Sequence, residues 1–206
     1  HQVFGYQGVN SARTLLFGTV DVRDGMVESL NTGGLSIEAP GESILAYMQG
    51  FNTEHSWPQG QFDRIDPMVS DLHHIYAVDV SSNGSRASYG FGYNGAEGSG
   101  LGPSTTDTRS RVYQVRRERR GDIARAHFYM VARYAFDPTV EIVFDDDMDD
   151  TNGRMDDDEE VLLRQWKLED PVDDWERQRN ERVHALQGNR NPFIDRPDLA
   201  DRVSNF

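Results

Sequence analysis

Strand-like and helix-like segments follow one another along this chain of 206 residues without the regular strand–helix–strand alternation that builds parallel sheets. Leu15–Val22, Leu72–Val78 and Thr139–Phe144 are predicted as strands, because they are short and rich in apolar or β-branched residues. This mixed order predicts an α+β fold. The length suits a single domain over residues 1–206.

Three helices are predicted in the second half of the chain. Gly121–Tyr134 has apolar residues at helical spacing, and Val161–Leu168 continues in the same pattern. A third helix is expected to begin with Asp170 as its N-cap and to end at Gly188. The tail 189–206 is punctuated by proline and aspartate, so we expect it to wrap the surface.

The composition excludes several kinds of chemistry. Without cysteine there is no disulfide, thiolate metal site or cysteine nucleophile. No apolar run approaches the 18 or so residues of a membrane span, so no membrane contact is expected. The net charge of −14 is unfavourable for attracting nucleic acid over long distances. Lys167 is the only lysine, which is consistent with a salt-tolerant protein or with a GC-rich genome.

Much of the acidic charge lies in one run, Asp145–Glu160. Asp150, Asn152 and Glu159 lie at offsets like those of an EF-hand calcium loop. Met148 occupies the first ligand position of that pattern, however. The run is therefore predicted to be a solvated acidic loop rather than a calcium site.

Glu54 and His55 are neighbours in a polar, aromatic stretch, Phe51–Gln59. Neighbouring residues on a strand face opposite sides, so the two share a pocket only if the strand bulges or ends there. Taken alone, the pair is better explained as a partly exposed glutamate beside a histidine at the edge of the core.

A second stretch holds the histidine pair His73-His74. Histidine pairs are common zinc ligands, although a zinc site needs a third ligand from elsewhere. After the pair, Ser81-Ser82 is expected to cap a short helix that carries Asn83 and Arg86 on one face. A strand–loop–strand–helix unit that holds a histidine early and an asparagine late is a plausible frame for a metal hydrolase.

A dense cationic cluster follows at Arg116, Arg117, Arg119 and Arg120. Against the acidic background it is the candidate nucleic-acid-binding surface. The competing interpretation is a solvated helix entrance whose arginines pair with nearby acids.

Several of these motifs, in their order, resemble the bacterial endonuclease I family of secreted or periplasmic nucleases. The resemblance rests first on Asn52–Gln59, Asp71–His74 and Asn83–Arg86, and then on four later segments. Those segments are 121–126, 170–173, 179–180 and 187–193. It covers the chain from about Gly50 to Pro197.

The resemblance implies a ββα-metal site with His55 as general base, and Glu54 and Asn83 as metal ligands. Arg86 would lie near the scissile or product phosphate. A neutral imidazole can deprotonate water near pH 7. Mg²⁺ prefers oxygen ligands, keeps several waters and needs only one or two protein contacts.

The resemblance also implies that His73 and His74 shape the site around the metal, with His73 near enough to contact a metal ligand or its bound water. The arginines of the cationic cluster would contact the nucleic acid. Relatives commonly have proline where this chain has Ala77, and many have histidine where it has Lys167. Neither departure falls on a proposed ligand.

The function implied is a divalent-metal-dependent, sequence-non-specific endonuclease that leaves 5′-phosphate ends. Its partner would be DNA, with RNA as a second substrate, and its cofactor Mg²⁺, with Mn²⁺ or Ca²⁺ as alternatives. We expect a monomer without an obligate protein partner, secreted or periplasmic after loss of a signal segment. Two alternatives stay open: an inactive nucleic-acid-binding protein on the same fold, and a zinc hydrolase that uses His73 and His74.

Overall fold

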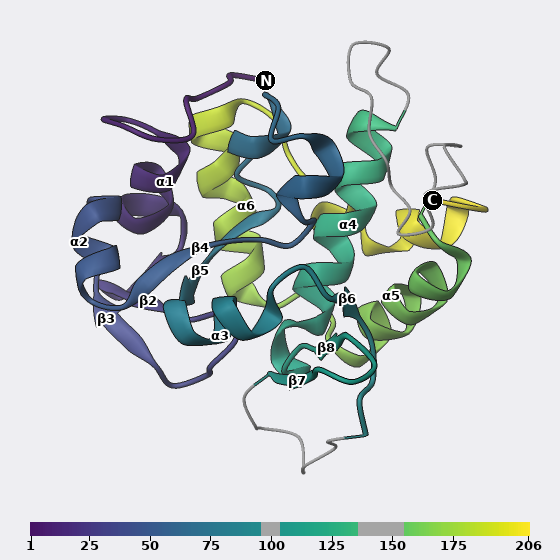
Figure 1. Ribbon diagram of the computed structural model, residues 1–206. Helices are drawn as coiled ribbons and strands as arrows, with labels where there is room; N and C mark the ends of the chain where they lie inside the picture. Colours follow the sequence, from purple (N-terminus) through teal and green to yellow (C-terminus); the bar gives the residue numbers. More distant parts are fainter. Residues whose placement is uncertain (96–103, 136–154) are drawn as a thin grey trace.

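Two antiparallel strands lie at the centre of the computed structural model, which describes residues 1–95, 104–135 and 155–206 (Figure 1). Strand β4 (Phe51–His55) pairs with β5 (Ile75–Asp79) so that Glu54 lies opposite Tyr76 and His55 opposite Ile75. Helix α3 (Val80–Arg86) follows β5 directly and packs back on both strands. This strand–strand–helix unit carries Glu54, His55, Asn83 and Arg86, the four predicted catalytic residues.

Two small three-stranded sheets and a set of helices surround this unit. The first sheet is antiparallel, in the order β1 (Val22–Arg23), β2 (Met26–Glu28) and β3 (Ser36–Glu38). The second has the order β6 (Gly90–Phe91), β8 (Val112–Gln114) and β7 (Thr105–Asp107), with β6 and β8 parallel. The α-helices are α1 (Ala12–Leu15), α2 (Ser43–Met48), α4 (Arg120–Tyr134), α5 (Asp157–Glu169), α6 (Asp174–Gln187) and α7 (Pro192–Asp195). The predicted α+β class is confirmed.

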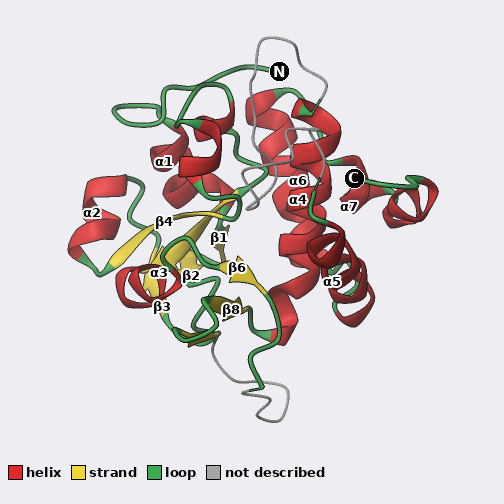
Figure 2. Cartoon of the chain, turned by 45° about the vertical axis from the view of Figure 1, so that its right-hand side comes forward, coloured by secondary structure: helices red, strands yellow, loops and turns green. Residues whose placement is uncertain are grey.

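The core is divided between the two faces of the central strand pair. Ile75 and Ala77 point to one face, where they pack with buried residues of the α1 region and with Val183 of α6. Tyr76 points to the other face and joins the larger cluster that includes α4 and α5. Figure 2 shows the strands with α2 on one side and with α4 and α5 on the other. Alternation along β5 therefore decides which core each side chain enters.

The predicted strand Leu15–Val22 is wrong. Residues 12–20 form α1 followed by a π-helical turn, Leu16–Val20, and only Val22–Arg23 is extended. Leu16, Phe17 and Val20 are fully buried in this turn. Gly18 and Thr19 are exposed, so Leu16 and Val20 are buried at helical i, i+4 spacing. An apolar run this short does not separate a strand from a helix by its pattern alone. The predicted strand Thr139–Phe144 lies outside the described residues.

The helix predictions are confirmed, with corrected beginnings. The third helix begins after Asp173, whose carboxylate accepts the backbone N–H of Glu176, and it ends at Gly188, which has a positive φ of 82°. Asp170 is not its N-cap: it ends α5, and its carboxylate accepts the N–H of Gly121. The cap of α3 is also different, because Asp79 rather than the serine pair accepts the Ser82 N–H.

Two predictions about irregular segments need correction. The described part of the acidic run is not all loop, because its residues from Asp157 onward form the first turn of α5. Carboxylates are favourable there, next to the positive end of the helix dipole. Met148, Asp150 and Asn152, which were compared with a calcium loop, lie outside the described residues. The tail 189–206 does not only wrap the surface, because Phe193, Ala200 and Phe206 are buried in the larger core.

Candidate active site

Asn83 is brought to the strand pair by the geometry of α3. Its side-chain amide donates to the backbone carbonyl of Thr53 in β4, at 3.4 Å between Nδ2 and O. This hydrogen bond uses the nitrogen of the amide and leaves the oxygen for other partners. Asn83 is half-buried, in contrast to the buried residues of β4 and β5 around it. The structure thus places the Asn83 side-chain amide beside β4.

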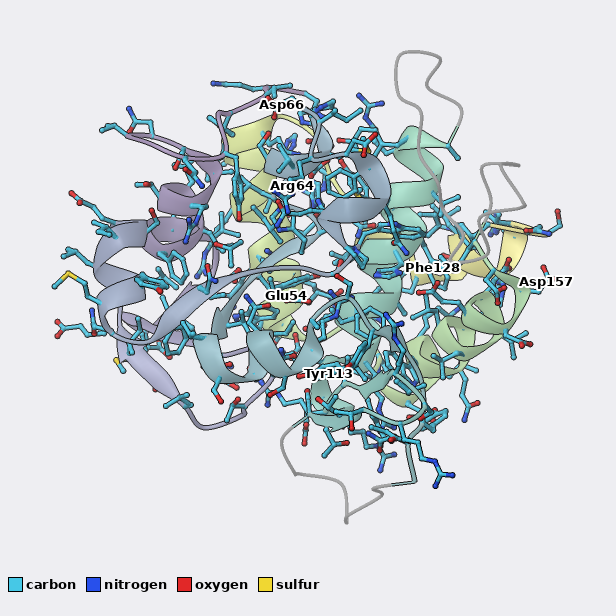
Figure 3. All side chains as sticks on the ribbon, in the orientation of Figure 1. Glu54, Arg64, Asp66, Tyr113, Phe128 and Asp157 are labelled. Atoms are coloured by element: carbon cyan, nitrogen blue, oxygen red, sulfur yellow. The ribbon has the colours of Figure 1, made fainter. Side chains whose placement is uncertain are left out.

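Glu54 lies near the middle of the molecule, where the strands meet α3 (Figure 3). Its side chain is buried and its Oε1 is 2.8 Å from Nη1 of Arg86. Burial raises the pKa of Glu54 to about 7, although the Arg86 guanidinium opposes this shift. One arginine therefore compensates only in part for the cost of a charged carboxylate at this position.

His55 ends β4, and its ring points away from Glu54, as the strand alternation requires. It lies against the rings of Tyr6 and His74, with centroids 5.1 and 5.3 Å away. Its Nε2 is 3.0 Å from the carbonyl oxygen of Val69. A carbonyl only accepts, so Nε2 carries the proton and Nδ1 holds the lone pair. That Nδ1 is buried and has no hydrogen-bond partner in the described part of the chain.

The electrostatics of His55 keep its imidazole neutral. Burial is the largest cause, and together with the neighbouring His74 it lowers the pKa of His55 to about 3. The hydrogen bond to Val69 opposes the shift but does not outweigh it. At neutral pH the Nδ1 lone pair is therefore present in essentially every molecule, which is the state required of a base.

The two histidines of the 73–74 pair point in different directions. His74 lies beside His55, and its Nε2 is 2.6 Å from the carbonyl oxygen of Met68. The His73 ring instead lies tilted against Tyr129 of α4, 4.5 Å between centroids, and its Nε2 contacts the carbonyl of Asn189. Only His74 is thus in a position to shape the site, and the expected contribution of His73 is not supported.

Arg86 occupies a different place from the one expected. Its guanidinium is buried and donates to the carbonyl oxygens of His55 and Ser56, at 3.1 and 2.8 Å, besides pairing with Glu54. Through these contacts of Nη1 and Nη2 it holds the end of β4 and the Glu54 carboxylate in place, while its buried Nε has no hydrogen-bond partner among the described residues. The structure does not support the expected contact of Arg86 with a phosphate.

The arginines at 116–120 do not form a shared cationic surface. Arg116 pairs with Glu28, Arg119 with Asp122, and Arg120 with Glu169. The side chains of these three arginines are at most 10% exposed, and Arg117 is the exposed member of the cluster. The competing interpretation, arginines paired with nearby acids, describes this segment better.

Some neighbours of the site were not predicted. The Val69 carbonyl defines the proton position on His55, yet a backbone oxygen leaves no mark in a sequence. Tyr6 and Arg13 lie against the His55 side of β4 from a segment without any motif. The nearest signal was an aromatic residue before the Ser11 helix cap and a basic residue after it, which is too common a pattern to identify a site.

The side chains fit a divalent cation of the oxygen-preferring kind. Glu54 supplies a buried carboxylate that one arginine neutralises only partly, and a bound cation would favour its charged form. Asn83 supplies a second oxygen from α3. Two protein ligands suffice for Mg²⁺, which keeps most of its water. No group of three His, Asp or Glu side chains suited to a metal occurs among the residues described. The zinc alternative needs His73 and His74 to act together, and their rings lie against different partners.

An acid and a histidine at the end of one strand, with an asparagine on the helix after the next, define a ββα unit of the kind expected from the sequence. A family model for endonuclease I matches residues 30–198, and the chain belongs to this family. No helix in the described ranges is long and apolar enough to cross a membrane.

Curated relatives carry the names of nucleases. The chain is 36% identical over 159 residues to an extracellular ribonuclease of Bacillus subtilis (strain 168), covering 74% of this chain and 54% of that protein. It is 31% identical over 140 residues to an extracellular deoxyribonuclease of Aeromonas hydrophila, covering 66% and 54%. A periplasmic deoxyribonuclease of Aeromonas hydrophila is also 31% identical, covering 66% and 52%. The chain spans about half the length of these relatives.

Proposed function

We propose that this chain is a divalent-metal-dependent endonuclease that hydrolyses phosphodiester bonds without sequence specificity and leaves 5′-phosphate ends. The observation that carries the proposal is the state of His55. Its Nε2–H is held by the Val69 carbonyl, its Nδ1 lone pair has no partner in the described chain, and Glu54 precedes it.

The role of His55 follows from this geometry. The imidazole accepts a proton at Nδ1 from the attacking water, and the Val69 carbonyl stabilises the imidazolium by keeping its hydrogen bond to Nε2. His74 lies beside the ring and restricts its rotation. Proton abstraction by a positioned side chain contributes about 10²–10⁴-fold to the rate.

Glu54 and Asn83 are the residues that would hold the metal. A divalent cation bound there supplies charge neutralisation for the phosphate and the leaving 3′ oxygen. Glu54 is oriented by Arg86, and Asn83 is oriented by its hydrogen bond to the Thr53 carbonyl. The ion would be Mg²⁺, with Mn²⁺ or Ca²⁺ as alternatives, because both protein ligands are hard oxygens.

The substrates would be DNA and RNA. Relatives are named ribonucleases and deoxyribonucleases, and both nucleic acids share the phosphodiester group at which this site acts. Contacts to phosphate carry no base information, which supports cleavage without sequence specificity. The named locations of the relatives support a secreted or periplasmic protein. We further propose that it acts as a monomer.

A plasmid-nicking assay with matched metal conditions tests this proposal. The protein treated with EDTA is expected to leave supercoiled DNA intact, and Mg²⁺ in excess is expected to restore nicking. Glu54→Gln, which keeps the shape but not the charge, should require much more Mg²⁺ for the same rate. Cleavage that persists in EDTA would overturn the metal-dependent assignment, and products that ligate only after phosphatase and kinase treatment would overturn the predicted ends.

A further inference from the structure

Arg13 is a half-buried cation beside the site whose hydrogen bonds go to neutral side chains. Its Nε donates to Thr53 Oγ1 at 3.2 Å, and its Nη2 donates to Asn52 Oδ1 at 3.1 Å. No ion pair in the described ranges involves it, although the chain has 35 acidic residues. By contrast, Arg86, close by, pairs with a carboxylate. A partly desolvated guanidinium without a counter-ion is costly, and an anion is the ligand that would relieve this cost.

The position of Arg13 is fixed by its helix and by a backbone hydrogen bond. It lies in α1, whose N-cap Ser11 accepts the N–H of Thr14. Its own N–H points to the carbonyl of Tyr6, and its guanidinium carbon lies 5.7 Å from the Tyr6 ring. Tyr6 in turn contacts the His55 ring. The segment thus presents an aromatic ring and a cation to the same side of β4.

This side of β4 is the one from which His55 would act. Thr53 and His55 are two residues apart on the strand and point to the same face, about 6.6 Å apart along it. If the scissile phosphate lies next to the water activated by His55, the neighbouring phosphate of the same nucleic-acid strand lies within reach of Arg13. Arg13 also precedes the segment 30–198 matched by the family model.

We propose that Arg13 is a substrate-binding residue that contacts the phosphate next to the scissile one in a nucleic-acid strand. The inference rests on the proposed nuclease function and deepens it. Because this phosphate does not react, the contact is equally strong before and during the reaction. Loss of Arg13 should therefore raise KM and leave kcat nearly unchanged.

A DNA-binding measurement that does not depend on cleavage separates this inference from the catalytic proposal. Affinity for a short DNA duplex is measured in the His55→Ala background at fixed Mg²⁺ and several NaCl concentrations. Adding Arg13→Gln should weaken binding about tenfold. It should also reduce the slope of log Kd against log salt by about 0.9, the value for one duplex phosphate contact. Arg13→Lys should keep the slope, because it keeps the charge.

Arg23→Gln is the charge-matched control, because Arg23 is an exposed arginine of β1. It should leave both affinity and slope unchanged. If Arg13→Gln lowers the melting temperature, Arg13→Met replaces it, since methionine keeps the apolar stem. An unchanged slope in the folded neutral variant, or the same loss in Arg13→Lys, would overturn the role of Arg13. Product formed by the His55→Ala background would instead overturn the catalytic proposal.

Discussion

At the residue scale, the site depends on a division between two neighbours in the chain. Glu54 faces Arg86 on one side of β4, and His55 faces His74 on the other. The sequence predicted both residues, through their resemblance to a family motif. It could not predict the tautomer of His55, because that depends on the Val69 carbonyl, 14 residues further along the chain. The position of Arg86 was equally hidden from the sequence, since two of its partners are backbone oxygens and the third is the Glu54 carboxylate.

His55→Ala is expected to lower the cleavage rate by about 10²–10⁴-fold while the protein stays folded. The reason is that His55 combines an unpartnered ring nitrogen with a hydrogen-bonded second nitrogen. Among the described groups near β4, His74 shares this combination and is equally buried. Initial rates on plasmid DNA measure the effect, and circular dichroism checks the fold. If the variant keeps more than roughly a tenth of the rate, His74 becomes the better candidate for the base.

At the element scale, α3 matters because it is short and yet carries Asn83. A helix of seven residues is too short to be stable alone, so its ends must be held by the rest of the protein. Asp79 does this: its carboxylate accepts the Ser82 N–H at 2.8 Å and the Ser29 hydroxyl at 2.9 Å, and it also accepts from Thr32. The cap therefore ties α3 to the β2–β3 turn region.

Asp79→Ala is expected to lower the free energy of unfolding by about 0.5–2 kcal/mol, as for other lost N-caps. It should also raise the Mg²⁺ concentration for half-maximal cleavage, because Asn83 loses its rigid support. Thermal denaturation and a Mg²⁺ titration measure the two effects. Asp173→Ala is the matched control, since it removes the N-cap of α6. If both variants shift the Mg²⁺ requirement equally, the cap has no specific role at the site.

How far the sequence predicted the elements depended on their surroundings. Gly121–Tyr134 was recognised to within one residue of α4, because its apolar spacing is clear. Leu15–Val22 was predicted wrongly because an apolar run this short fits a strand as well as a helical turn. The cap of α6 was misplaced because Asp170 has a tertiary partner, the Gly121 N–H, that no local pattern contains. Local signals identified helices; long-range contacts decided where they begin.

At the scale of the whole molecule, buried histidines couple stability to pH. Burial lowers the pKa of His74 to about 4, against about 6.5 in the unfolded chain. Between these values the unfolded state binds more protons, so this group's contribution to stability is complete above pH 6.5 and is lost as pH falls toward 4. The raised pKa of Glu176, about 8, acts in the opposite direction over the same range. The net curve therefore hides the contribution of a single histidine.

A comparison of variants isolates the contribution of His74 to stability. The stability advantage of the wild type over His74→Gln should fall by up to about 1.4 kcal/mol per pH unit between pH 6.5 and 4. Urea unfolding at several pH values measures it. Thr19→Val, at an exposed position whose side chain does not titrate, should differ from the wild type by a constant amount. A constant difference for His74→Gln as well would mean that His74 is not buried as a neutral ring.

The net charge of −14 predicts an unusual response to salt. Most nucleases that bind through many cations lose affinity as salt rises, because each phosphate contact releases counter-ions. Here the arginines at 116, 119 and 120 are already paired with carboxylates, so this cluster has Arg117 as its exposed member to attract DNA. The long-range field of 35 acidic against 21 basic residues repels it instead.

Added salt screens this repulsion, because the Debye length falls to about 10 Å at 0.1 M and about 3 Å at 1 M. It also relaxes the mutual repulsion of the carboxylates in the folded state. We therefore expect kcat/KM on plasmid DNA to reach its maximum at a few tenths molar NaCl or above, with the melting temperature rising over the same range. At one fixed Mg²⁺ concentration, rates from roughly 0.02 to 2 M NaCl decide the question. If kcat/KM falls steadily from the lowest salt upward, genome composition alone explains the scarcity of lysine. It would leave the nuclease assignment intact, because the chemistry at His55 does not depend on the surface field.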